Sequence, residues 1–167
     1  MAVSNKLGGM VVTTGNKSEM AVGYATLYGD MCGGFNVLKD VYKTTVFELC
    51  RWRNKHLPQG ALGKAGAVIS TRIIDKPPSA ELRPDQQDSD SLPPYPVLDA
   101  VLKGLIERDL STADLAKEGH DPAVVDRVWR LLEGAEYKRR QAPPGVKITS
   151  RNISRERRYP IVNGFRG

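Results

Sequence analysis

The 167-residue sequence predicts an α/β domain that begins with a strand and helices and continues into a helical second half. A short apolar run rich in β-branched residues, 10–13, is followed by polar residues that are typical of a helix start. Three later stretches repeat apolar residues at helical spacing. The length is that of one domain with a real core. We divide it into a strand and helix core at 1–55, loops at 56–95, helices at 96–142 and a basic tail at 143–167.

The first residues are expected to form a helix that stops at a glycine pair. Residues 1–7 resemble the last turns of a helix, and Gly8 and Gly9 are a typical helix stop. A helix followed by a strand, with no earlier strand, is half of a βαβ unit. We therefore expect the sequence to begin inside a domain.

Residues 11–30 are the stretch around which the chain is organised. The strand ends near Gly15, and Asn16 or Ser18 can cap a following helix whose first turn contains Glu19. At such a junction the free backbone N–H groups and the positive end of the helix face outward together, where they suit phosphates or a metal. An ordinary capped helix is the alternative interpretation.

A glycine pair and a second helix follow. Gly33 and Gly34 allow a close backbone approach to a ligand or a sharp turn, or form a simple connector. A helix is expected at 40–55, with Asp40 as its cap and one apolar face. That face is made of Val41, Thr45, Val46, Leu49 and Trp52. Lys43 taken alone is typical of a solvated surface lysine.

The middle of the sequence, residues 56–95, is predicted to form loops. Residues 56–68 have the glycine and proline content of a surface loop, and the double proline at 77–78 ends any helix before it. Ser79 taken alone is a turn or capping serine. Residues 83–94 are polar, acidic and proline-rich, and loops of this length inside a compact domain are often functional lids.

Three helices are predicted in the second half. An apolar stripe covers 97–106, Ser111 caps a short helix that ends at Gly119, and a third helix opens at 121–122. We interpret these stripes as core.

Charge and cysteine content limit the classes of function. The net charge of +6 is concentrated after residue 137, where a single acid, Glu156, faces many cations. Those cations are Lys138, Arg139, Arg140, Lys147, Arg151, Arg155, Arg157, Arg158 and Arg166. No apolar run approaches the roughly 20 residues of a membrane span and no signal peptide is evident, so we expect a cytoplasmic protein. Cys32 and Cys50 lack metal-type spacing and are expected to be reduced structural thiols.

Several motifs in one order resemble the synthetase domain of NAD+ synthases, particularly the long, glutamine-dependent type. They are TTGNKSE (13–19), GYATLYGD (23–30), KDVYK (39–43), CRWRN (50–54), PPSAELRPDQ (77–86), DSLPPY (90–95), EYKRRQAPPG (136–145) and RRYPIVN (157–163). The resemblance spans the whole sequence. It implies an adenine-nucleotide α-hydrolase-like (Rossmann-like) fold, with a mostly parallel sheet that is truncated here at its N-terminus.

The resemblance also implies a reaction in NAD+ biosynthesis. The nicotinate carboxylate of deamido-NAD+ would attack the α-phosphate of ATP, and ammonia would then displace AMP from the acyl adenylate. ATP and Mg2+ would be required, ammonia would come from glutamine in the intact parent, and a homodimer is expected. Such catalysis relies on positioning and charge neutralisation, with no protein nucleophile or base.

Site residues follow from the same resemblance. The ATP-binding positions are Thr14, Lys43 and Ser79. The deamido-NAD+ positions are Glu19, Tyr24, Ala25, Thr26, Leu27, Tyr137 and Lys138, and Glu19 is also the metal position. The tail after Gly145 is expected to close over the site, or across a dimer partner, as a lid that excludes water.

The sequence departs from the family in two places. It contains neither the Ser-Gly-Gly-x-Asp-Ser loop that cradles pyrophosphate nor a glutaminase domain. We therefore expect these 167 residues to be inactive alone.

Two other classes of function remain open. Residues 111–141 have the outline of a helix-turn-helix with a basic extension, but its acids would repel a nucleic acid backbone, so nucleic acid is not the expected partner. The third class is a dimerisation module without catalysis that uses Trp52 or Trp129.

Overall fold

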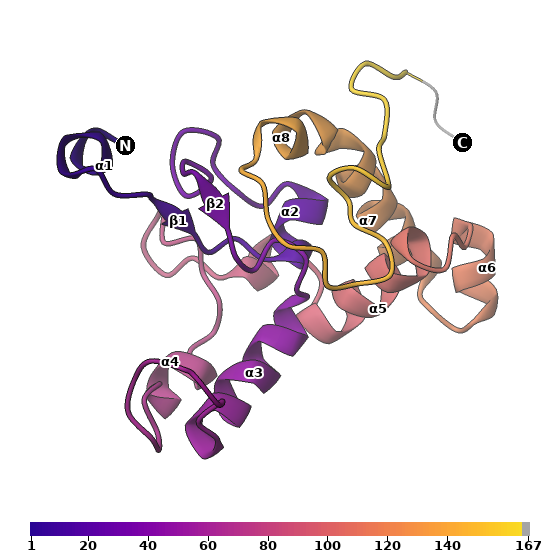
Figure 1. Ribbon diagram of the computed structural model, residues 1–167. Coiled ribbons are helices and arrows are strands. Elements are labelled where there is room, and N and C mark those ends of the chain that lie inside the picture. Colours follow the sequence, from indigo (N-terminus) through magenta and orange to yellow (C-terminus); the bar gives the residue numbers. More distant parts are fainter. Residues whose placement is uncertain (165–167) are drawn as a thin grey trace.

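The computed structural model describes residues 1–164 and has an α/β fold in which helices predominate (Figure 1). Arg166 of the basic tail lies outside the described residues. The first half contains α1 (Ala2–Leu7), β1 (Val12–Thr13), α2 (Lys17–Val22), β2 (Phe35–Asn36), α3 (Lys43–Lys55) and α4 (Thr71–Asp75). After a 3₁₀ turn, η1 (Asp88–Asp90), come α5 (Tyr95–Ile106), α6 (Thr112–Lys117), α7 (Pro122–Gly134) and α8 (Glu136–Gln141). No helix among the described residues is long and apolar enough to cross a membrane.

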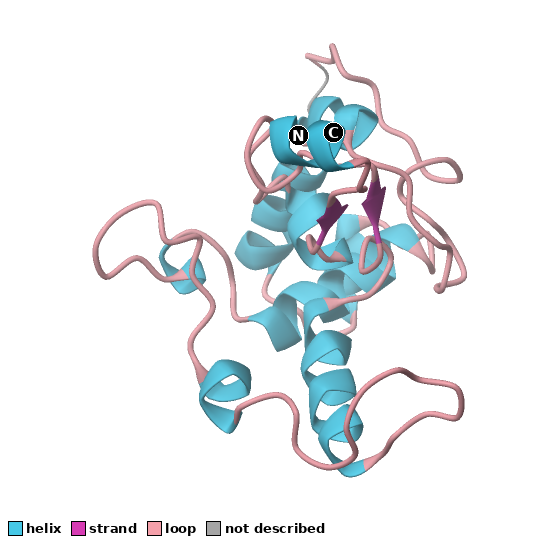
Figure 2. Cartoon of the chain, turned by 60° about the vertical axis from the view of Figure 1, so that its left-hand side comes forward, coloured by secondary structure: helices cyan, strands magenta, loops and turns pink. Residues whose placement is uncertain are grey.

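The sheet of the described chain has two short parallel strands, which Figure 2 shows beside each other among the helices. Val12 pairs with Phe35, and Thr13 pairs with Asn36. The glycine pair makes this pairing possible, because a Cβ on Gly33 would lie 2.6 Å from Cγ2 of Thr13. These glycines therefore approach a neighbouring strand, whereas the sequence suggested a ligand or a turn. β2 itself was not predicted.

The core lies where α2, α5 and α7 pack together. Leu98 and Leu102 of α5 are fully buried, as are Val125, Val128 and Leu132 of α7. The three predicted helices of the second half are confirmed. The basic extension is a separate short helix, α8, because the chain turns at Ala135.

The predicted start of α3 is wrong. Asp40 does not cap it; instead Ser18 and Asp99 accept hydrogen bonds from the first amides, those of Lys43 and Thr44, each at 2.9 Å. Of the predicted apolar face, Val41 precedes α3 and is 4% exposed, whereas Leu49 is 45% exposed. No residue of α3 is fully buried, although Lys43 at its start is largely so. Figure 1 shows α3 and α4 extending away from the other helices.

The described part of the tail wraps back onto the first half of the chain. The amide of Asn36 donates to the carbonyl of Pro144 at 2.8 Å, so the tail runs along β2. Asp40, which is 1% exposed, accepts hydrogen bonds from the amides of Ile148 and Thr149, both at 2.8 Å. The tail is thus part of the folded structure.

Candidate functional site

The loop between β1 and α2 fixes Glu19 at the start of α2. Oδ1 of Asn16 accepts the amide N–H of Glu19 at 3.0 Å, and Oε2 of Glu19 accepts the amide N–H of Asn16 at 3.1 Å. This reciprocal capping box satisfies two amides that the helix leaves free. Asn16 is therefore the cap, and the Glu19 carboxylate has a fixed position.

Lys43, at the start of α3, pairs with that carboxylate. Its Nζ lies 2.8 Å from Oε1 of Glu19, and both side chains are largely buried. The ammonium also lies 5.3 Å from the ring centre of Tyr95, close enough for a cation–π contact. Lys43 is thus a partly buried site residue, and the alternative of a solvated surface lysine is wrong.

The loop after α2 is held in place by Lys138 of α8. Nζ of Lys138 donates to the carbonyls of Gly23 and Ala25, both at 2.7 Å. Gly23 ends α2 with φ +72°, and a Cβ there would lie 2.8 Å from Cβ of Ala135. An ammonium has three donors, so Lys138 has one left for a ligand.

Residues 79–94 form the acidic loop, which is the opposite wall. Ser79 Oγ accepts the amide N–H of Glu81 at 3.1 Å, which is the role of a turn serine. Tyr95 donates its hydroxyl hydrogen to Oδ2 of Asp88 at 2.6 Å. Burial, together with this hydrogen bond, raises the pKa of Tyr95, so the phenol stays neutral and remains a donor. Burial and the charge of Asp88 likewise raise the pKa of Tyr24.

These walls enclose a cavity of about 550 Å³, within the usual range for small-molecule sites. It brings together most of the residues that the sequence indicated. They are Glu19, Tyr24, Ala25, Thr26, Lys43, Ser79 and Lys138, which come from α2, the loop after it, α3, the acidic loop and α8. Gln86 and Asp88, from residues 83–94, line the wall, and the role of this loop as a lid stays a prediction.

Three predicted residues do not line this cavity. Thr14 is exposed in the loop before α2, Leu27 packs against the core, and Tyr137 is 43% exposed on α8. No described residue of the tail lines it. The expectation that the tail forms a lid over this cavity is therefore wrong for the described residues, and a lid across a partner stays a prediction.

Sequence reasoning missed several residues of the cavity. Asp88 is 5% exposed, and its Oδ1 has no hydrogen-bond partner among the described residues. Asp99, which does not line the cavity, was also missed; it is buried on α5 and positions Ser18 and α3. In the sequence, Asp88 is one of several acids in a proline-rich loop, and Asp99 is an acid within the apolar stripe of a helix. Neither position by itself indicates a role.

The side chains of this cavity fit Mg2+ only if the phosphates of a substrate supply further ligands to the ion. Within residues 1–164, no group of three or more His, Cys, Asp or Glu side chains could hold an ion by itself. Glu19 and Asp88 nevertheless line the same cavity, and Mg2+ is commonly held by one or two carboxylates together with substrate phosphates and water. Oδ1 of Asp88 has no hydrogen-bond partner among the described residues, but this atom is buried and exposes almost no surface.

Comparisons with known proteins show the family of the chain. The family model described as NAD synthase matches residues 1–142. The glutamine-dependent NAD+ synthetase of Acinetobacter baylyi is 59% identical over 99% of the chain, and that of Rhodobacter capsulatus is 56% identical over 99%. The chain covers only 29% and 30% of these two proteins.

A solved structure gives the same result. The crystal structure of a glutamine-dependent NAD+ synthetase from Cytophaga hutchinsonii is 25% identical to the chain, with a TM-score of 0.73. The match covers 98% of the chain and 26% of that protein. The likeness of motifs is thus matched by a likeness of fold, and the chain belongs to the NAD synthase family.

Proposed function

We propose that the chain forms the dinucleotide side of a cytoplasmic, ATP-dependent ligase that converts deamido-NAD+ to NAD+, with ammonia derived from glutamine in the full-length protein. The observation that carries the proposal is the meeting of Glu19, Lys43 and Lys138 in one cavity, although they lie far apart in the sequence. The 167 residues are proposed to be part of one such ligase domain.

The cavity offers the groups that a dinucleotide needs. Tyr24 gives a flat ring, the backbone of residues 23–26 gives polar edges, and Lys138 gives a fixed cation for phosphate. Because Lys138 is anchored by two carbonyls, its remaining N–H has a defined direction. It would therefore orient a phosphate at little conformational cost.

Lys43 and Glu19 would serve the ATP end. Their ion pair keeps the free site near neutral charge, and an arriving phosphate could take over Lys43 while Glu19 turns toward the metal. Bound Mg2+ would neutralise charge on the phosphates. Glu19 and Asp88 would hold it, while Ser79 and Thr14 are proposed as further ATP contacts.

Activation by ATP has a simple chemical reason. A carboxylate oxygen is a poor group for ammonia to expel, whereas AMP leaves readily from a mixed anhydride. Because the adenylate is hydrolysed by water, the site must be closed. Residues 79–88 stand over the cavity and are proposed to supply that closure.

Binding of deamido-NAD+ is the test of this proposal. We expect titration calorimetry to show saturable binding that Lys138→Gln weakens about tenfold or more, since a charge-assisted contact of roughly 1.5–3 kcal/mol is lost. The matched control, Arg72→Gln, removes an exposed cation on α4 and should bind as the unchanged chain does. Equal binding by both variants would count against the site.

Catalysis by the 167 residues alone is a separate question. Because they lack the Ser-Gly-Gly-x-Asp-Ser loop, we propose that they bind ATP weakly and form no NAD+. The measurement is NAD+ formation from deamido-NAD+, ATP, Mg2+ and ammonia, detected with a coupled dehydrogenase. Turnover above a blank without protein would overturn this part.

A further inference from the structure

A second cavity, of about 800 Å³, lies between α8 and the tail and shares no lining residue with the first. Its wall is strongly basic, with one lining carboxylate, that of Glu156. The cations of this basic cavity are Lys39, Arg139, Arg140, Lys147, Arg155 and Arg158.

Lys39 is a buried cation of this cavity. Only 3% of it is exposed, and its Nζ donates to the carbonyl of Pro143 at 2.6 Å. Burial and the nearby charge of Arg155 lower the pKa of Lys39. No carboxylate lies within ion-pair distance of Lys39 in the described chain, so a bound anion would supply the missing countercharge.

The other cations of the basic cavity differ in how many hydrogen bonds and ion pairs they already form with the protein. Arg139 is buried and donates to Glu136 and to two backbone carbonyls, so it is structural. Lys147 pairs with Glu156 at 2.6 Å. Arg155 and Arg158 are exposed and form no ion pair or hydrogen bond with described residues, which leaves both guanidinium groups available to a ligand.

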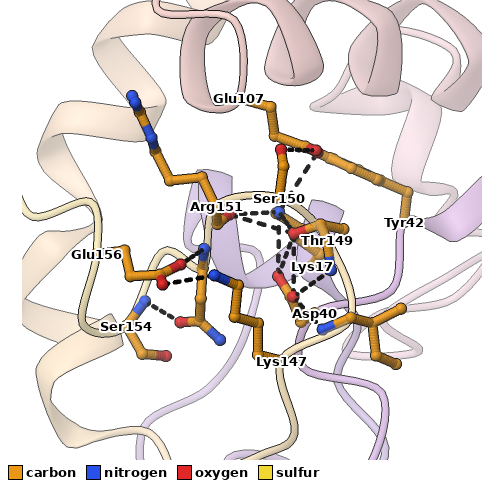
Figure 3. A network of polar contacts seen from close by, with 12 residues as sticks. Lys17, Asp40, Tyr42, Glu107, Lys147, Thr149, Ser150, Arg151, Ser154 and Glu156 are labelled. Carbon is orange, nitrogen blue, oxygen red and sulfur yellow. Dashed lines mark hydrogen bonds and ion pairs between the residues drawn. The ribbon is translucent and has the colours of Figure 1, made fainter.

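The tail wall is held by a buried network, shown in Figure 3. Nζ of Lys17 lies 3.0 Å from Oδ1 of Asp40, and it donates to Oγ1 of Thr149 and to the carbonyl of Arg151. Oε2 of Glu156 accepts the amide of Asn152 at 2.8 Å. These contacts fix the course of the tail on both sides of the cavity before any ligand arrives.

We propose that this basic cavity binds a small anion that carries two or more phosphate groups. An arginine guanidinium can donate two parallel hydrogen bonds to two oxygens of a phosphate. A buried lysine ammonium beside it favours a compact ligand with several negative charges. A nucleic acid strand needs an extended basic track, whereas these cations converge on one concavity.

The test is calorimetric titration of the chain with inorganic pyrophosphate at low salt. The double variant Arg155→Gln/Arg158→Gln removes two available cations without touching the buried network. We expect it to weaken binding at the basic cavity at least about tenfold. The matched control, Lys6→Gln/Arg72→Gln, removes two exposed cations elsewhere and should leave binding unchanged.

A third variant separates the two cavities. Lys43→Met alters only the first cavity, so pyrophosphate binding that is lost in Lys43→Met but kept in the arginine variant would overturn the proposal. Absence of binding, or equal weakening in the control, would do the same. A single-stranded oligonucleotide that binds more tightly than pyrophosphate through the same arginines would point to nucleic acid and overturn it as well.

Discussion

Lys17 is a single buried side chain on which the fold depends. It is completely buried between α2 and the tail, where Asp40 and the ring of Tyr42 surround its ammonium. Removing one member of a buried ion pair leaves the other charge uncompensated, which costs about 3–5 kcal/mol.

Lys17→Met should therefore destabilise the chain by that amount, measured by urea unfolding. Lys117→Met removes the ammonium of an exposed ion pair with Asp114 and is the control, with an expected change within about 0.5 kcal/mol. Similar midpoints for both variants would contradict the role given to Lys17.

Gly23 is the second residue with a sharp prediction. Alanine there meets both a left-handed backbone and Cβ of Ala135 at 2.8 Å. The backbone effect alone costs about 1–2 kcal/mol, and thermal unfolding should show at least this loss. Gly134→Ala on α7 is the control, because a Cβ there meets nothing within 4 Å. Its stability should be unchanged or higher by up to about 1 kcal/mol.

The tail is the element whose attachment should depend on pH. Burial raises the pKa of Glu107, but hydrogen bonds from Ser150 and Tyr42 and the charge of Lys17 outweigh this and lower it overall. A hydrogen bond from the amide of Asn152, with Lys147, lowers the pKa of Glu156. A hydrogen bond from Arg151 lowers that of Asp109.

A carboxyl group whose pKa is lower in the folded than in the unfolded chain stabilises the fold at neutral pH. The ordinary pKa is 4.5 for Glu and 3.8 for Asp. The stabilisation is lost as the pH falls below these values and through the lower pKa of the folded state. We expect the protection factors of the amides in residues 147–156, corrected for the intrinsic exchange rate at each pH, to fall between about pH 5 and pH 3, before those of α5 and α7. Equal protection of tail and core down to pH 3 would refute this assignment.

What the sequence predicts at the scale of elements depends on how local the cause is. The capping box at Asn16 and the helical stripes of α5 and α7 act within a few residues, and the structure confirms them. The start of α3 depends on Ser18 and Asp99, which come from other elements. β2 depends on a strand more than twenty residues earlier, and two strand residues leave no visible pattern.

The same distinction between local causes and contacts with other elements applies to the residues of the candidate site. Motif likeness indicated Glu19, Lys43, Ser79 and Lys138, all of which line the cavity, whereas Asp88 and Asp99 act through tertiary packing and left no periodic signal. Asp40 resembled a helix cap because it precedes α3. It is instead a partner of the tail more than a hundred residues later.

At the scale of the whole molecule, apolar side chains remain exposed around the small sheet. Val3, Leu7 and Met10 are each at least 69% exposed beside β1. An open strand edge with apolar neighbours favours pairing with another chain. We expect the chain to self-associate, with a mass by light scattering that rises with concentration. Leu7→Glu/Met10→Glu should shift the chain toward monomer, and a concentration-independent monomer would contradict this.

Tyr24, Glu19 and Lys138 are proposed to line a dinucleotide site. The decisive measurement is a crystal structure of the chain grown with deamido-NAD+. We expect ligand density in the 550 Å³ cavity, with a phosphate oxygen bonded to Nζ of Lys138 and a ring against the loop of residues 23–30. Clear density at another place on the chain, with this cavity empty, would contradict it.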